Sequence, residues 1–217
     1  MKKGYSKTII VLGRSGSGKD TQARLLAKKF GYAVFATGDA LRETAKKPTF
    51  LGKRLRRELK LGHLAPTWLA SFLWINMLIR SDPSRGIIFN GSPRKLSEAK
   101  FLNEVLSWLG RRAPCVFLVD VGEREALLRL TKRRICTRCA FVVPYVDEFK
   151  FWSRCRKCGG LLRGRPDDRV RAIRTRFLWF KKEVEPVIRF YKKQGLLERV
   201  DGEQPIEVVF NDLLKAL

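Results

Sequence analysis

Residues 8–19 read Thr8-Ile9-Ile10-Val11-Leu12-Gly13-Arg14-Ser15-Gly16-Ser17-Gly18-Lys19. The apolar run at the start of this stretch predicts a buried strand, and a GxxxxGK pattern follows it directly. The pattern after Lys19 predicts a helix that extends to about Phe30. Glycines permit a tight loop whose backbone N–H groups point inward, and the start of a helix adds partial positive charge. The stretch therefore predicts a phosphate-binding loop (P-loop) whose Lys19 reaches the β- and γ-phosphates of a nucleotide.

Strands alternate with helices along the rest of the chain. Further strands are predicted at 32–36, 86–89, 115–119 and 197–200. Helices are predicted over 39–80 with breaks at Pro48 and Pro66, from about Asp167 to Gln194, and from Pro205 onward. Such alternation is typical of a parallel sheet covered by helices. We therefore expect an α/β fold of the P-loop NTPase type, with a five-stranded parallel sheet and helices on both faces.

The chain is strongly basic. It has 46 lysines and arginines against 21 aspartates and glutamates among 217 residues, a net charge of +25. Such a surface attracts polyanions, which include nucleotides, nucleic acid and anionic lipid, but a solvated basic face has the same composition. The sequence contains no run of 18 apolar residues and no pattern of a signal peptide, so we expect a cytoplasmic protein without a membrane partner.

Four of the five cysteines form two CxxC pairs. Cys136 and Cys139 are separated by fifteen residues from Cys155 and Cys158. Two such pairs are typical of four thiolates around a tetrahedral zinc ion, and four protein ligands leave no open position, so a structural role is expected. A pair of redox dithiols is the alternative. The fifth cysteine, Cys115, lies in an apolar strand and is expected in the core.

The segment around Lys19 also carries a family resemblance. Gly18-Lys19-Asp20-Thr21-Gln22 resembles the GKGTQ motif of adenylate kinases, and further motifs follow in the order of that family. They are Thr37-Gly38-Asp39-Ala40-Leu41-Arg42 (TGDxLR), Gly62-His63-Leu64-Ala65-Pro66 (GxLVP), Asn90-Gly91-Ser92-Pro93-Arg94 (DGFPR), Gly164-Arg165-Pro166-Asp167-Asp168 (GRxDD) and Val200-Asp201-Gly202 (VDG). Arg176 follows Arg165 at the family's spacing. Some members have a four-cysteine lid that begins, like this one, with RRIC (133–136).

The resemblance implies a division of the chain into three parts. A core domain comprises 1–37, 67–128 and 166–217, a monophosphate-binding insertion comprises 38–66, and a zinc-binding lid comprises 129–165. The implied ATP-binding residues are Ser15, Gly16, Ser17, Gly18, Lys19, Asp20, Thr21, Arg129, Arg133, Val142, Val143 and Gln204. The implied monophosphate-binding residues are Thr37, Gly38, Arg42, His63, Leu64, Ala65, Gly91, Arg94, Glu98, Arg165 and Arg176. The implied catalytic residues are Lys19, Arg94, Arg133, Arg165 and Arg176.

Three departures from the family pattern matter for function. Asn90 replaces the acidic residue that helps to organise magnesium and its waters, a task for which Asp39 or Asp20 can compensate. Glu98 replaces a glutamine that reads adenine, and an ionised carboxylate can only accept hydrogen bonds. Glu98 therefore either favours another base, such as guanine, or turns to solvent or a nearby cation. Residues 140–143 lack the polar and tyrosine pair that many members place over ATP.

The resemblance implies reversible transfer of the γ-phosphoryl group from Mg²⁺-bound ATP to AMP by a monomer with a structural Zn²⁺. The first alternative is the same reaction with GMP, UMP or CMP as acceptor. The second is an RNA-associated nucleotide-binding protein with weak or no kinase activity, which the charge and the cysteine knuckle favour.

Overall fold

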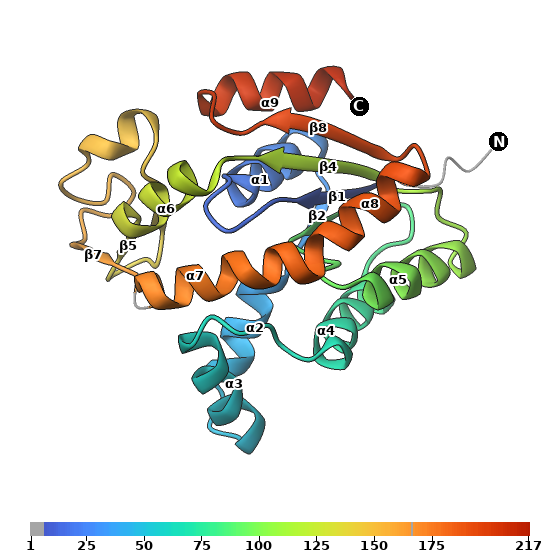
Figure 1. Cartoon of the computed structure of the whole chain (residues 1–217), viewed down its shortest axis with the longest axis horizontal. Helices are drawn as coiled ribbons and strands as arrows, with labels where there is room; N and C mark the ends of the chain where they lie inside the picture. The colour runs from blue at the N-terminus through green and yellow to red at the C-terminus, as the bar shows by residue number, and fades with distance from the viewer. Residues whose placement is uncertain (1–6, 166) are drawn as a thin grey trace.

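The fold is organised around a parallel sheet of five strands. The computed structural model describes residues 7–165 and 167–217. The strand order is β2 (Ala33–Ala36), β3 (Ile87–Asn90), β1 (Thr8–Leu12), β4 (Cys115–Asp120) and β8 (Leu197–Asp201), and all neighbours are parallel. This arrangement confirms the predicted α/β sheet, and the P-loop strand β1 lies at its centre (Figure 1).

Helices cover both faces of the sheet because successive side chains of each strand point to opposite faces. Ile10 and Leu12 of β1 face a core that also includes Trp74 and Tyr191. The helices of that face are α4 (Thr67–Arg80), α5 (Leu96–Trp108) and α8 (Glu185–Lys193). Ile9 and Val11 face the other core, which is formed with α1 (Lys19–Phe30) and α9 (Ile206–Lys215).

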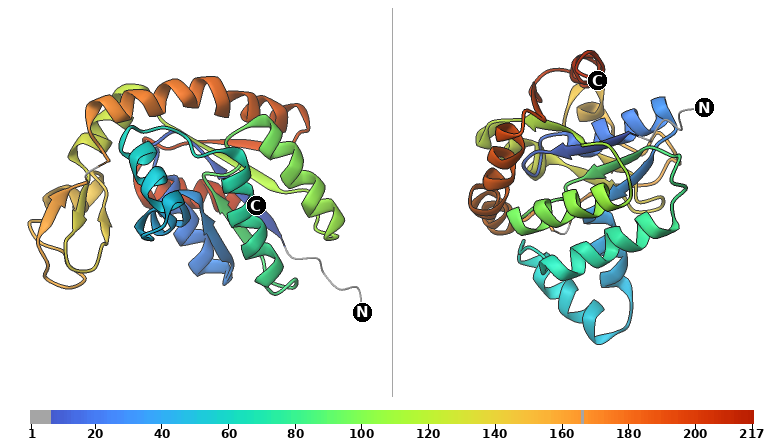
Figure 2. Two further views of the ribbon diagram at one scale, coloured as in Figure 1. Left: turned by 90° about the horizontal axis from the view of Figure 1, so that it is seen from below. Right: turned by 90° about the vertical axis from the view of Figure 1, so that its right-hand side faces the viewer.

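A pair of short helices extends from the carboxyl end of β2. These are α2 (Thr37–Lys46) and α3 (Phe50–Lys60), and Pro48 and Pro66 lie in the breaks that the sequence predicts. Leu41, Leu55 and Leu69 form a small separate core that joins the pair to α4. Figure 1 and Figure 2 show α3 projecting from the body of the molecule.

The predicted helix from Asp167 to Gln194 differs from the structure in two respects. It begins later, with α7 (Val170–Trp179), because Asp167 and Asp168 bind arginines in the loop before it. A π-helical turn, η2 (Phe180–Val184), then separates α7 from α8. Pro186 explains this turn, since it has no N–H for an ordinary helical hydrogen bond to residue 182.

The cysteine-rich segment forms a second, antiparallel sheet that the sequence analysis did not predict. It follows α6 (Glu123–Lys132) and has the strand order β6 (Val142–Val143), β5 (Arg134–Cys136) and β7 (Leu162–Gly164). A 3₁₀ turn, η1 (Asp147–Phe151), lies between β6 and β7. In Figure 2 this segment projects from one end of the molecule, beyond α6.

Candidate functional site

The P-loop has the backbone conformation that its glycines permit. Gly16 and Gly18 adopt φ values of +89° and +88°, a left-handed region that favours glycine. A Cβ atom on Gly13 would lie 2.6 Å from the carbonyl oxygen of Val119, so that position also excludes a side chain. Gly18 is the N-cap of α1, and the loop therefore presents the helix N-terminus to the space above the sheet.

Lys19 reaches back over this loop. Its Nζ donates to the carbonyl oxygen of Arg14 at 3.4 Å. Desolvation lowers the pKa of Lys19 more than the neighbouring Asp20 raises it, and Arg94, Arg133 and Arg176 lower it further. A lysine placed among cations in this way is suited to a ligand that carries several negative charges.

A first cavity lies beside the P-loop and has a volume of about 320 Å³. It is lined by most of the residues that the sequence predicts for ATP: Gly16, Ser17, Gly18, Lys19, Asp20, Thr21, Arg129, Arg133, Val142 and Gln204. Val143 is fully buried and does not line it, and Ser15 lines the second cavity instead.

Aromatic side chains that the sequence analysis missed also line the first cavity. They are Phe141, Tyr145 and Phe149, all from the cysteine-rich segment. Phe141 and Phe149 pack against Trp152, with ring centroids 6.1 Å and 4.8 Å away. Such rings offer a flat apolar surface for a nucleobase. The sequence shows that aromatic residues recur between the two CxxC pairs, but this spacing does not show where their side chains point.

Arg129 lines this cavity but uses its guanidinium to hold a loop. Its Nη1 and Nη2 donate to the carbonyl oxygens of Gly202 and Glu203 at 2.8 Å and 3.3 Å. Gln204 follows directly and hydrogen-bonds to Asp212 through its side chain. The backbone of the predicted VDG region is therefore fixed at the edge of the first cavity.

The second cavity has a volume of about 100 Å³ and lies between the P-loop, α2 and α7. The predicted residues that line it are Ser15, Gly16, Lys19, Asp20, Gly38, Arg42, His63, Gly91, Arg94, Arg133, Arg165 and Arg176. Lys19, Arg42, Arg133 and Arg165 line both the first and the second cavity, so the two meet at these four cations. His63 lies at the rim, where its Nδ1 is 2.8 Å from Glu58.

The third cavity is small, about 10 Å³, and adjoins the second through Leu41 and Arg94. Besides Arg94, it is lined by four of the residues predicted for the monophosphate site, namely Thr37, Leu64, Ala65 and Glu98. Its volume is that of a single water molecule, so a nucleobase has to widen it.

Glu98 is almost fully buried, with 2% of its surface exposed, so the alternative that it turns to solvent is wrong. One carboxylate oxygen accepts from the hydroxyl of Ser92 at 2.8 Å. The other accepts from the backbone N–H of Arg94 at 2.7 Å. Thr37 extends the chain of hydrogen bonds by donating to Ser92 at 2.7 Å.

Arg94 is held with its terminal nitrogens available. Its Nε donates to the carbonyl oxygen of Gly91 at 2.7 Å, and its guanidinium lies 5.4 Å from the ring centroid of Trp179. In the part of the chain that the structure describes, neither terminal nitrogen of Arg94 has a hydrogen-bond partner. Desolvation lowers the pKa of Arg94 to about 10, although the nearby negative charge of Glu98 raises it.

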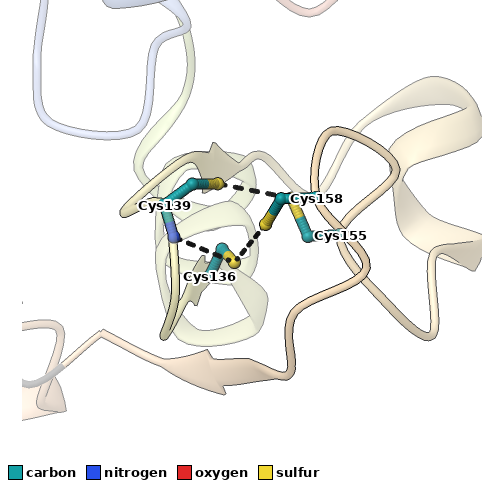
Figure 3. Close-up of side chains that lie close together, drawn as sticks. All are labelled: Cys136, Cys139, Cys155 and Cys158. Atoms are coloured by element: carbon teal, nitrogen blue, oxygen red, sulfur yellow. Dashed lines mark hydrogen bonds between the residues drawn. The ribbon is translucent and has the colours of Figure 1, made fainter.

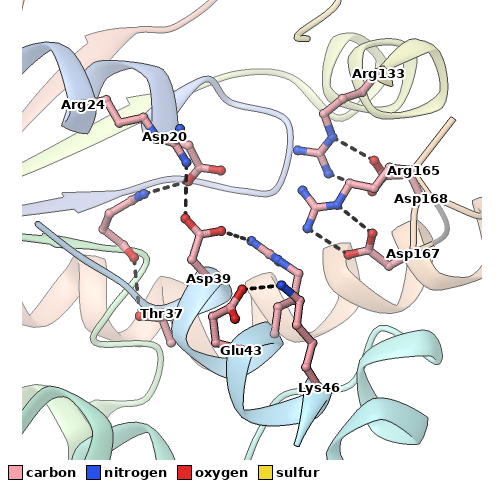
Figure 4. A network of polar contacts seen from close by, with 12 residues as sticks. Asp20, Arg24, Thr37, Asp39, Glu43, Lys46, Arg133, Arg165, Asp167 and Asp168 are labelled. Atoms are coloured by element: carbon pink, nitrogen blue, oxygen red, sulfur yellow. Dashed lines mark hydrogen bonds and ion pairs between the residues drawn. The ribbon is translucent and has the colours of Figure 1, made fainter. Parts of the chain in front are cut away.

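Two aspartates hold Arg133, Arg165 and Arg176 around the point where the cavities meet, and Figure 4 shows Asp168 with Arg133 and Asp167 with Arg165. Asp168 accepts from Arg133 at 2.8 Å and from Arg176 at 3.0 Å. Asp167 accepts from Arg165 at 2.7 Å and from Arg176 at 3.0 Å. Desolvation raises the pKa of Asp167, but Arg165 and Arg176 outweigh it and hold that pKa below its usual range. Pro166, between these motif residues, lies outside the described residues.

The four predicted cysteine ligands converge in the projecting segment (Figure 3). Their sulfur atoms all lie within 4.8 Å of one another, at 3.5 Å for Cys136–Cys158 and 3.6 Å for Cys139–Cys155. These distances exceed the roughly 2 Å of a disulfide and approach the roughly 3.8 Å edge of a tetrahedron with Zn–S bonds of about 2.3 Å. Backbone N–H groups of Cys139 and Arg138 donate to Cys136 and lower its pKa to about 6, despite desolvation. The cluster is therefore compatible with zinc.

Comparisons with known proteins agree with this geometry. The family model described as adenylate kinase matches residues 11–196. The adenylate kinase of Archaeoglobus fulgidus is 37% identical over 94% of this chain and 95% of its own. Those of Caldicellulosiruptor saccharolyticus and Methanothrix thermoacetophila are 35% and 33% identical, each over 96% of this chain and over 98% and 97% of their own. No helix in the described ranges is long and apolar enough to cross a membrane. A family model that covers most of the chain, relatives that cover nearly all of it and a P-loop that borders two cavities together establish that this chain belongs to the adenylate kinase family of nucleoside monophosphate kinases.

Proposed function

We propose that this protein transfers the γ-phosphoryl group of Mg²⁺-bound ATP to AMP, reversibly, to give two molecules of ADP. The observation that carries the proposal is the meeting of two cavities at Lys19, Arg133 and Arg165. One cavity offers room for a triphosphate on the P-loop, and the other is lined by Arg42, Arg94 and Arg176. Two nucleotides bound there would face each other across these cations.

Each charged residue has a role in this proposal. Lys19 and the P-loop N–H groups hold the phosphates of ATP, and Arg133 binds them from the other side. Arg42 and Arg94 hold the phosphate of the acceptor, while Arg165 and Arg176 span both nucleotides. The transferred phosphoryl group spreads negative charge over three oxygens, so fixed cations stabilise its transition state. Asp167 and Asp168 keep the guanidiniums oriented before the substrates arrive, and this lowers the cost of arranging them.

The proposed parts of the chain keep the predicted boundaries. The core comprises 1–37, 67–128 and 166–217, of which 1–6 and 166 lie outside the described residues. The insertion 38–66 carries Arg42 and α3, and the lid 129–165 carries Arg133 and the aromatic side chains of the first cavity. Both line the cavities, so closure of either over the substrates would exclude water.

A structural zinc ion in the lid is part of the proposal. Cys136 and Cys155 are buried, and four thiolates at the observed separations form a closed tetrahedral donor set. The ion would link β5 to the second CxxC pair and so fix Phe141, whose carbonyl oxygen accepts from the N–H of Cys136 at 2.9 Å.

GMP is the second candidate acceptor, and Glu98 is the observation that favours it. Both carboxylate oxygens of Glu98 already accept one hydrogen bond from the protein. Each oxygen has a further lone pair, and both can accept but not donate while the group is ionised. Guanine offers neighbouring donors at its ring N–H and exocyclic amine, whereas adenine offers one donor beside an acceptor. AMP remains the primary proposal because the curated relatives carry the name adenylate kinase.

The test is diphosphate formation with Mg²⁺-ATP and, separately, AMP, GMP, CMP and UMP, for the wild type and Glu98→Gln. Preference for AMP in the wild type supports the main proposal, and Glu98→Gln should then keep it. Preference for GMP that Glu98→Gln reverses by about tenfold or more supports the second candidate. No product with any acceptor would refute both, and salt-sensitive RNA binding would then support the RNA-associated alternative.

A further inference from the structure

Two departures from the family motifs lie against each other in the phosphoryl-transfer site. Asp20 stands where the GKGTQ motif has glycine, and Asn90 stands where DGFPR has aspartate. The Nδ2 of Asn90 donates to Oδ1 of Asp20 at 2.8 Å, from the end of β3 to the first turn of α1. Position 90 therefore lacks the carboxylate of the family motif, and position 20, on the other side of this hydrogen bond, carries one.

Asn90 has an acceptor that the protein leaves unused. Only 5% of its surface is exposed, and in the described part of the chain its Oδ1 has no hydrogen-bond partner. An unpaired buried amide oxygen is destabilising unless a water or a ligand pairs with it. Because Asn90 lines the second cavity, that partner can come from the cavity.

Asp20 is also the carboxylate best placed to receive a cation. Three carboxylates line the first and second cavities, namely Asp20, Asp39 and Asp167. Asp39 is paired with Arg42 and Arg24, and Asp167 with Arg165 and Arg176. Within residues 7–165 and 167–217, Asp20 is the one of the three without a salt bridge. It is exposed, follows Lys19 in the chain and lines both cavities.

Asp20 stays ionised in this setting. Desolvation raises its pKa, but Lys19, the hydrogen bond from Asn90 and the nearby Arg133 hold that pKa well below its usual range. Among the described residues, Oδ2 of Asp20 and Oδ1 of Asn90 have no hydrogen-bond partner, so these two oxygens form a set of oxygen ligands. Magnesium prefers such ligands and keeps several of its waters, so it is held by one or two carboxylates and the phosphates of its nucleotide.

We propose that Asp20, oriented by Asn90, is the acidic residue that holds the magnesium ion of ATP and its waters in this protein, in place of the aspartate that the family has at position 90. This inference rests on the proposed function. A bound magnesium ion would neutralise part of the negative charge on the β- and γ-phosphates of ATP. Asp20, in the first turn of α1, would hold the waters bound to the ion. The Oδ1 of Asn90, at the end of β3, would accept a hydrogen bond from a second water.

The test compares the affinity for ATP with saturating Mg²⁺ and with EDTA, measured by titration calorimetry on the zinc-loaded full chain. The wild type should bind Mg²⁺-ATP more tightly than ATP alone. Asp20→Asn keeps the shape of the side chain but removes its charge. It should weaken Mg²⁺-ATP binding about tenfold, strengthen binding of metal-free ATP, and raise the Mg²⁺ concentration for half-maximal activity by a similar factor. Glu198→Gln removes an exposed carboxylate on β8 and serves as the control for net charge.

A double variant tests the exchange of the carboxylate directly. Asp20→Gly with Asn90→Asp restores the family's arrangement. It should return the ratio of the affinity for Mg²⁺-ATP to that for metal-free ATP to within about threefold of the wild type. Asp20→Gly alone should not restore this ratio. The proposal is wrong if Asp20→Asn and Glu198→Gln give the same ratio, or if the double variant behaves as Asp20→Gly does. Failure of the proposed function is seen separately, as absence of phosphoryl transfer in a wild type that still binds Mg²⁺-ATP.

Discussion

Arg133 and Asp168 form a two-point ion pair, in which Nε and Nη2 of the arginine each donate to a different carboxylate oxygen at 2.8 Å. The pair joins the end of α6 to the loop before α7, and Asp168 also accepts from Arg176. The side chain of Asp168 is only 3% exposed. This aspartate therefore fixes two of the arginines of the proposed transfer site without needing to touch a substrate itself.

Replacement of Asp168 by asparagine should lower both stability and activity. It leaves Arg133 and Arg176 without their shared counter-charge in a buried position, and loss of one partner of a buried ion pair costs about 3 kcal/mol. Misplaced arginines should reduce kcat/KM by about 100-fold. Urea unfolding and initial-rate kinetics measure the two effects.

The matched control is Glu148→Gln, which removes the partner of Arg156 in an exposed ion pair. An exposed pair contributes between about 0 and 1 kcal/mol, so little change is expected. If Asp168→Asn has no more effect than this control, the positioning role of Asp168 is wrong.

The stability that Asp167 contributes should disappear in acid. Its pKa in the folded protein lies below its usual value of 3.8, so the unfolded chain binds its proton first as the pH falls. The contribution is therefore fully present above about pH 5 and is lost as the pH falls through the folded-state pKa. Asp167→Asn should have a lower Tm than the wild type at pH 7, and the difference should shrink below about pH 4. A constant difference in Tm from pH 7 to pH 3 would contradict this.

The sequence predicts the central sheet well because its signals are local. Each core strand is a short apolar run bounded by turn residues, and the P-loop combines a strand, a glycine pattern and the start of a helix within twelve residues (8–19). Pro48 and Pro66 mark helix breaks for a reason that depends only on proline. The convergence of the four cysteines likewise follows from their spacing alone.

Features that depend on distant partners could not be predicted in this way. Val142 and Val143 are neighbours of similar composition, yet one lines the first cavity and the other is fully buried, because the pairing of β6 with β5 decides which side faces in. The contact between Asp20 and Asn90 joins residues 70 positions apart. The burial of Glu98 depends on Ser92 and on the Arg94 backbone, whose conformation is not readable from residue types.

Phe141 should contribute to ATP affinity, since it lines the first cavity from the lid. Phe141→Ala removes a flat apolar surface for the base, and loss of one stacked base contact costs about 1–3 kcal/mol. The KM for ATP should therefore rise by about tenfold, while the KM for the acceptor changes little. Phe151→Ala is the control, because Phe151 belongs to the same segment but is 83% exposed and does not line the cavity. Equal effects of the two substitutions would show that Phe141 acts only through the general stability of the lid.

Zinc removal should unfold the lid and leave the parallel sheet intact. The lid has few buried apolar residues besides Trp152 and Val143, so the metal would supply most of its folding energy. Cys155→Ser should abolish stoichiometric zinc, which elemental analysis of the purified protein measures. The KM for ATP should rise, because the first CxxC pair fixes Phe141 through the N–H of Cys136.

Cys115→Ser is the matched control: Cys115 lies in β4 outside the cluster, so this variant should keep its zinc and its KM for ATP. Amide hydrogen exchange locates the effect, with faster exchange expected over 134–164 and unchanged protection in β1 and β4. A wild type without zinc whose lid amides are nonetheless protected would mean that the four cysteines pack as thiols and that the aromatic cluster holds the lid together on its own.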